Sequence, residues 1–133
     1  RLFKFMTGGE ANVSADFPFG VIGSTLENLQ ASAAGEHYEH SEMYPAFSEI
    51  AKEEGFEDIA EAFISIAIAE KQHEKRYLDL AKNIETDKVF KKDEIVVWRC
   101  LNCGYLHKGR DALDQCPACL HKLEYFELLG ENY

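Results

Sequence analysis

Four cysteines in the last third of the chain constrain its fold more than any other feature. They form two Cys-x-x-Cys pairs with twelve residues between them: Cys100 and Cys103, then Cys116 and Cys119. Two such pairs present four thiolates tetrahedrally, which suits zinc or a single iron, and the spacing does not separate these metals. Disulfides are the alternative in a secreted protein. Because no secretion signal is present, we expect a metal site in a reducing compartment.

Charge and cysteine content divide the 133 residues into two parts. Residues 1–97 carry ten basic and nineteen acidic side chains, whereas residues 98–133 carry four and five. We therefore predict a Glu-rich domain at 1–86 and a cysteine module at 94–133, joined by a charged linker around Asn83–Glu94. The net charge of −10 argues against nucleic acid or an anionic membrane surface as a partner. No apolar stretch is long enough to span a bilayer.

The small module needs a core of its own. Trp98, Tyr105 and Phe126 are the obvious candidates for it. His107 and His121 also fall within the module, but four thiolates already fill a tetrahedron. We therefore expect both histidines at the surface.

The first domain shows the pattern of two long helices. Ser24 and Glu27 form a capping box, so the first helix begins there, and Gly55 is placed to end it in a left-handed cap. The short connection at Glu54–Glu57 makes the second helix an antiparallel neighbour. Pro45 lies inside the first helix and should kink it. The apolar positions, in steps of three and four, are Leu26, Leu29, Ala33, Met43, Phe47 and Ile50, then Ile59, Phe63, Ile66, Tyr77, Leu80 and Ile84.

Polar side chains interrupt both apolar stripes. Glu36 and His40 fill the gap in the first helix, and Glu70 and His73 fill the gap in the second. Opposed residues of this hairpin should have numbers that add to about 110. Glu36 with His73, and Glu39 with Glu70, both add to 109. Glu-x-x-Glu facing Glu-x-x-His is the pattern of an iron or manganese carboxylate site in a helix bundle.

The alternative interpretation is a solvated face on an acidic protein. This interpretation suits any single glutamate. Burying several unpaired carboxylates is costly, however, so four such groups on the apolar stripes and at one level of the hairpin favour a metal site. His37 points off the stripe and is expected to be exposed. His40 is on the stripe, where a hydrogen-bonded core histidine is favoured over a ligand.

Five segments of this sequence closely resemble the rubrerythrin family, and together they cover essentially the whole chain. They are Ala34–Glu39 (AGEHYE), Glu42–Phe47 (EMYPAF), Ala69–Lys75 (AEKQHEK), Trp98–Tyr105 (WRCLNCGY) and Cys116–Cys119 (CPAC). That family joins a ferritin-like four-helix bundle with a di-iron centre to a C-terminal rubredoxin-like domain with one iron. The resemblance implies a mainly α fold. This chain would hold the second half of the bundle, as two long antiparallel helices, plus the small rubredoxin-like four-cysteine domain.

The resemblance also implies residue roles. Glu36 and Glu39 match di-iron ligands, Glu70 a bridging ligand and His73 a terminal one. The four cysteines match the ligands of the rubredoxin-like iron, a site where zinc can substitute. Tyr44 matches a tyrosine near the di-iron site. In this family the counterpart of Glu39 can release the metal as the redox state changes, so Glu39 is the expected mobile carboxylate.

The chain departs from the family at its beginning. Family members start with two further helices that supply a Glu and a second Glu-x-x-His, whereas residues 1–7 match only the end of the second of these helices, before Gly8 and Gly9. Because the chain opens on Arg1, we expect that helix pair elsewhere in the same protein, on another chain or swapped between copies. A homodimer or higher oligomer is the expected state.

The implied function is that of an NAD(P)H-linked peroxidase in the cytoplasm. Hydrogen peroxide would be reduced to water, with electrons passing from rubredoxin or another donor through the rubredoxin-like iron. Two other classes share parts of the pattern. A ferritin-like iron oxidase or store would use the carboxylates but would not need a tetrathiolate relay. A zinc-ribbon interaction module on a helical hairpin would need neither iron nor Glu36 on the core stripe.

Overall fold

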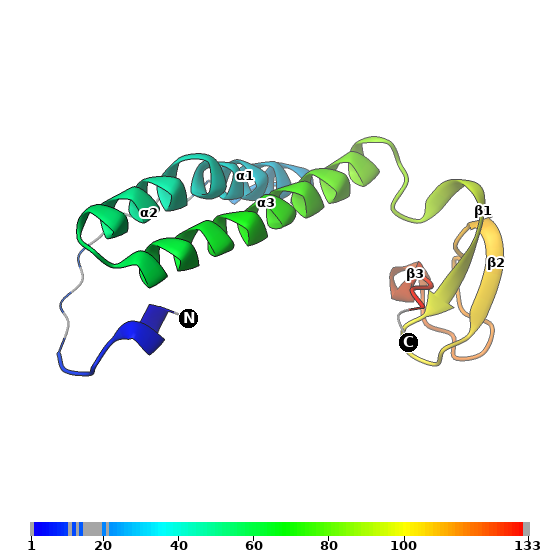
Figure 1. The fold of residues 1–133 in the computed structure, drawn as a ribbon. Helices are drawn as coiled ribbons and strands as arrows, with labels where there is room; N and C mark the ends of the chain where they lie inside the picture. The colour runs from blue at the N-terminus through cyan, green and yellow to red at the C-terminus, as the bar shows by residue number, and fades with distance from the viewer. Residues whose placement is uncertain (1, 11, 13, 15–19, 21, 132–133) are drawn as a thin grey trace. The chain divides into compact units, whose positions relative to one another are not determined.

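The computed structural model describes residues 2–10, 12, 14, 20 and 22–131 (Figure 1). The chain divides into two compact units, Arg1–Ala81 and Lys82–Tyr133. The first unit is helical and the second is built on a three-stranded sheet. The predicted mainly α class therefore describes the first unit only. The predicted domain limits, 1–86 and 94–133, stay a prediction.

The first long helix begins as its sequence indicates. Helix α1 spans Thr25–Tyr38, and Ser24 caps it. The Ser24 hydroxyl accepts a hydrogen bond from the Glu27 amide, while a Glu27 carboxylate oxygen accepts one from the Ser24 amide at 2.8 Å. The predicted capping box is thus confirmed, and it satisfies amide groups that no helical turn precedes.

The predicted kink at Pro45 takes the form of a wide turn. A π-helical segment, η2, spans Glu39–Met43, and helix α2 continues over Tyr44–Glu53 with the proline in its first turn. The Tyr44 amide donates to the Glu39 carbonyl, five residues back. In a regular α-helix the ring of Pro45 would clash with the carbonyl four residues back and its missing amide would break one hydrogen bond, and the wider π turn that precedes it accommodates both.

Helix α3 spans Glu57–Glu85 and runs antiparallel to α2 (Figure 1). The connection is closed by Gly55 at φ +81°, and the Phe56 amide donates to the Ala51 carbonyl at 2.8 Å. A left-handed residue at this position favours glycine because it has no Cβ to clash. The predicted hairpin and its glycine cap are confirmed.

Small residues make up the buried part of the hairpin. The buried positions are Ala33, Ser48, Ala51, Ala60, Ala62 and Ala81. The Ser48 hydroxyl donates to the Ala60 carbonyl at 3.1 Å across the two helices. Larger members of the predicted stripe stay partly outside, with Phe47 42% and Ile50 51% exposed. Two helices alone therefore bury little of the apolar surface that the stripe carries.

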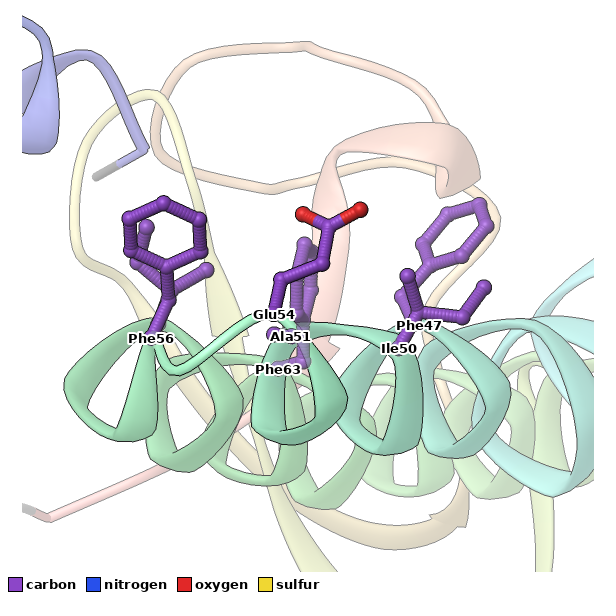
Figure 2. Close-up of a pocket in the computed structure, with 7 residues that line it drawn as sticks. Phe47, Ile50, Ala51, Glu54, Phe56 and Phe63 are labelled. Atoms are coloured by element: carbon purple, nitrogen blue, oxygen red, sulfur yellow. The ribbon is translucent and has the colours of Figure 1, made fainter.

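Aromatic rings gather near the closed end of the hairpin. Tyr44 stacks on Phe63 with a centroid distance of 6.0 Å, and Phe47 lies 5.5 Å from Phe63. Beside them is an open apolar groove of about 310 Å³, shown in Figure 2 with Phe56 at one end and Phe47 at the other. This end of the hairpin presents an apolar surface.

The N-terminal segment is shorter than predicted. Leu2–Phe5 forms a single 3₁₀ turn, η1, and not the last turns of an α-helix. Gly8 and Gly9 follow with φ +95° and +115°, conformations open to glycine. No helix among the described residues has the length and apolarity to cross a membrane.

The second unit is a three-stranded antiparallel sheet. Strand β1 (Lys91–Cys100) lies between β2 (Leu106–Asp111) and β3 (Phe126–Leu128), with a 3₁₀ turn, η3, at Leu123–Tyr125. The predicted linker at Asn83–Glu94 is too long. Helix α3 continues through Glu85 and β1 begins at Lys91, so only five residues join them.

Candidate metal centres

The four cysteines meet at one point of the second unit. One sulfur from each lies within 4.8 Å of the others. The Sγ atoms of Cys100 and Cys119 are 3.7 Å apart, and those of Cys103 and Cys116 are 3.6 Å apart. Thiolates bound tetrahedrally at 2.3 Å are separated by about 3.8 Å, so these distances fit a single zinc or iron ion.

Each cysteine pair sits on the same kind of turn. The Cys100 amide donates to the Tyr105 carbonyl at 2.9 Å, and the Cys116 amide donates to the His121 carbonyl at 2.8 Å. In both cases the acceptor is five residues further along the chain. The two halves of the site are therefore built by one local pattern used twice.

The two turns carry different residues at their left-handed position. The fourth residue after the first cysteine has a positive φ in both, +78° at Gly104 and +61° at Leu120. Glycine adopts this conformation freely, whereas a leucine is strained in it. The sequence signals this turn at Gly104 but gives no sign of it at Leu120.

A compact core supports the thiolates. Trp98 and Phe126 are buried together with Cys100 and Cys116. The Trp98 indole N–H donates to the Gly109 carbonyl at 3.3 Å. The predicted core is confirmed for these two aromatic residues.

Three side chains of the module depart from their predicted surroundings. Tyr105 was expected in the core and is 36% exposed, because it lies in the turn after the first cysteine pair. His107 and His121 are half-buried where the surface was predicted. The His121 ring packs on Tyr125 at a centroid distance of 4.3 Å, which accounts for its partial burial.

The surroundings of two of the cysteines shift their pKa values in opposite directions. The backbone N–H of His121 is the main cause that lowers the pKa of Cys119 to about 6, despite the opposing effect of burial. At Cys103 the backbone N–H of Tyr105 lowers the pKa, but burial and hydrogen bonds to the other thiols outweigh it and raise the pKa to about 12. One thiol is therefore readily ionised, while another holds a proton until a cation displaces it.

Glu36, Glu70 and His73 form a second cluster on the hairpin. One ligand atom from each lies within 4.8 Å of the others. His73 Nδ1 is 2.5 Å from a Glu70 oxygen and 3.7 Å from a Glu36 oxygen. The structure thus brings together three of the four predicted hairpin ligands, at the level that the residue numbers imply.

Glu39 lies outside that tight group but acts on it electrostatically. Burial and then repulsion from Glu70 raise the pKa of Glu39. Burial, followed by Glu70 and Glu39, likewise raises the pKa of Glu36. Like-charged carboxylates in one partly buried place are relieved by a cation. Three carboxylates and one imidazole suit an iron or manganese ion, so this donor set fits the predicted metal.

Sequence reasoning missed a further cluster on the same two helices. His37 is exposed, as predicted, and His40 is half-buried and hydrogen-bonded, also as predicted. Their shared partner, Glu74, was not singled out. The sequence could have predicted the contact between Glu74 and His37, since the two residues lie opposite each other in the same hairpin register.

A helical pair with a carboxylate-rich cluster, followed by a tetrathiolate module, defines a non-haem metalloprotein of the ferritin-like and rubredoxin-like kind. A family model described as "Rubrerythrin" matches residues 4–81, and one described as "Rubrerythrin, rubredoxin-like domain" matches residues 98–127. The chain belongs to the rubrerythrin family, whose members are di-iron oxidoreductases, and the predicted resemblance is confirmed.

Alignments over the whole of this chain support the assignment. The chain is 56% identical to a rubrerythrin of Nitratidesulfovibrio vulgaris over 133 residues, covering all of this chain and 70% of that protein. It is 49% identical to a rubrerythrin of Porphyromonas gingivalis over 133 residues, covering all of this chain and 66% of that protein. The chain thus spans about two thirds of the length of these curated relatives.

The chain also resembles a solved structure, "Partially Reduced State of Nigerythrin", at 32% identity and a TM-score of 0.49. The match covers 96% of this chain and 58% of the other. Iron, the predicted metal, agrees with the family and with both donor sets described above.

Proposed function

We propose that this protein is a non-haem di-iron peroxidase, in which one hydrogen peroxide takes two electrons and two protons to give two waters. The observation that carries the proposal is the meeting of Glu36, Glu70 and His73 on the hairpin, with Glu39 beside them. Both metal sites would hold iron, with zinc as a substitute in the thiolate site. A pair of ferrous ions held by these residues would supply both electrons needed to break the O–O bond, which would avoid release of a hydroxyl radical.

The four hairpin residues divide the work of holding the metals. Glu70 would bridge both ions, because it approaches Glu36 and His73 and also raises the pKa of Glu39. His73 would be a terminal ligand. Glu39 stands outside the tight group, which supports its role as the carboxylate that changes position with redox state.

Tyr44 would hold a proton beside this cluster. Burial, then the charges of Glu39 and Glu70, raise the pKa of its hydroxyl. The hydroxyl therefore stays protonated at neutral pH and can donate a hydrogen bond toward bound peroxide.

The cysteine module would deliver the electrons. Four soft thiolates would hold an iron ion in either oxidation state, so one-electron transfer would need no change of ligands. Rubredoxin or a similar donor, itself reduced by electrons from NAD(P)H, would pass electrons to this iron. We place the reaction in the cytoplasm, where such donors stay reduced.

Completion of the di-iron site requires more helices. A site of this type takes ligands from four helices. The proposed partner is an N-terminal helix pair with a Glu and a Glu-x-x-His, from the same protein or from another copy in a homodimer. The partly exposed Phe47 and Ile50 support a covering helix at this face.

The test is peroxide turnover by the iron-loaded protein assembled with that helix pair. Cys116→Ser should abolish steady-state turnover with a reductant but leave single-turnover oxidation of the pre-reduced di-iron site intact. Glu70→Ala should abolish both. Glu61→Ala, an exposed change on the same helix as Glu70, is the matched control. Unimpaired steady-state turnover in Cys116→Ser would contradict the electron relay, and oxidation of the pre-reduced helical iron site by peroxide in Glu70→Ala would contradict the assigned site.

A further inference from the structure

Two histidines and a glutamate form a third ligand cluster, separate from the two sites above. His37 Nδ1 lies 2.9 Å from one oxygen of Glu74, and His40 Nε2 lies 2.6 Å from the other. One ligand atom from each of the three residues lies within 4.8 Å of the others. A single carboxylate therefore draws two imidazole nitrogens toward one point.

The helices place these side chains by simple spacing. His37 is in the last turn of α1 and His40, three residues later, is in the π-helical segment η2, so both lie on one face. Glu74 reaches them from α3. The two rings are almost perpendicular, at 79° with centroids 5.1 Å apart. This arrangement lets two bulky rings direct nitrogens to the same carboxylate without clashing.

The cluster is anchored on one side and open on the other. The side chains of His40 and Glu74 are only 14% and 20% exposed, whereas that of His37 is 60% exposed. A groove of about 340 Å³ includes His37 and Glu74 in its lining and gives a route of entry. Lys75, next to Glu74 in the chain, is paired with Asp79 at 2.5 Å.

We propose that His37, His40 and Glu74 bind a zinc ion, with water in the fourth position. Two imidazoles and one carboxylate are a known three-ligand set for tetrahedral zinc. This nitrogen-rich set differs from the carboxylate-rich cluster of Glu36 and Glu70, and zinc binds such ligands more tightly than ferrous iron does. Tetrahedral ligands at 2.0–2.1 Å are about 3.3 Å apart, so the His37–Glu74 and His40–Glu74 distances of 2.9 Å and 2.6 Å would each open by less than about 1 Å.

A bound zinc would clamp the π-helical turn to α3. His37 follows Glu36 and Glu74 follows His73, so the clamp would hold the two helices at the level of the carboxylate cluster. The alternative is that the three side chains form only a hydrogen-bonded link between the helices. The two cases differ in zinc stoichiometry.

The experiment is a zinc titration of the full chain, with the thiolate site already zinc-filled and a chromophoric chelator as competitor. Glu74→Gln keeps the shape of the side chain and removes its charge. It should lose one binding event, or weaken it by more than about 100-fold, since even residues behind a ligand contribute about 10- to 100-fold. His40→Gln should do the same. His107→Gln, a half-buried histidine in the other unit, is the matched control.

Glu70→Ala separates this inference from the proposed function. It should remove binding at the carboxylate cluster and leave the event that depends on Glu74. Zinc binding by Glu74→Gln that matches the unaltered protein would overturn the inference. If circular dichroism shows that Glu74→Gln does not fold, the ring ¹⁵N resonances of the unaltered protein test zinc binding instead. His37 Nδ1 and His40 Nε2 should both shift on adding zinc, and unchanged resonances would refute the site.

Discussion

The cysteine module and the helical hairpin hold metal ligands in opposite ways. The module collects four thiolates from a stretch of twenty residues and supports them with its own buried core of Trp98 and Phe126. The hairpin collects its ligands from two long helices, and its buried residues are mostly alanines. A site made by local turns is complete in a short segment, whereas a site made by matching levels on helices depends on what covers their free face.

The largest expected effect is metal removal from the module. Cys116→Ser, or a strong chelator, should unfold the module, because structural tetrahedral sites contribute about 10–16 kcal/mol, as much as or more than the whole stability of most domains. Trp98 is the single tryptophan and is 1% exposed, so its emission reports this unit alone. Emission should shift to the red while helical circular dichroism is retained. Glu70→Ala should leave the Trp98 emission unchanged. If the emission of Cys116→Ser does not shift, the module does not depend on its metal site for stability.

The next effect concerns the free face of the hairpin. Alone, the chain should hold about one iron, in the thiolate site, and about three once a helix pair with a Glu and a Glu-x-x-His is supplied. Metal analysis combined with native mass measurement gives both counts. Two irons per chain without added helices would point instead to pairing of two identical hairpins.

A smaller difference is expected within the carboxylate cluster. In the assembled protein, Glu70→Ala should lose both irons of the helical site because a bridging ligand holds each of them. Glu39→Ala should keep them and change mainly the spectrum of the oxidised state. Equal iron loss in the two variants would contradict the assigned roles. Glu61→Ala should behave as the unaltered protein does.

The smallest effect tests the local turns of the module. Gly104→Ala places a Cβ in open space but at φ +78°, so it should lower the unfolding free energy by about 1 kcal/mol. Leu120→Gly should raise it by a similar amount, because Leu120 is strained at φ +61° and is 68% exposed. Denaturant titration followed by Trp98 emission measures both. Changes of the same sign would contradict the shared turn geometry.

Much of the architecture was readable from spacing alone. The two cysteine pairs, the capping box at Ser24 and the glycine cap at Gly55 each depend on residues that are close in sequence. Local backbone geometry fixes such features almost without regard to the rest of the fold. The meeting of Glu36 with His73 was also predictable, because a short connection sets the register of two regular helices.

Other features were decided only by tertiary structure. The width of the turn at Glu39–Met43, the exposure of Tyr105 and the left-handed Leu120 follow from how neighbouring segments pack and hydrogen-bond. The family assignment fits a four-helix bundle, but the described residues contribute one hairpin to it, and the bundle stays a prediction. The sequence by itself determined which ligands stand at which level, because helical and turn periodicity are local. The hairpin register places Glu74 opposite His37, but only packing in three dimensions determined that the same carboxylate also reaches His40, since that contact depends on the angle and separation of the helices.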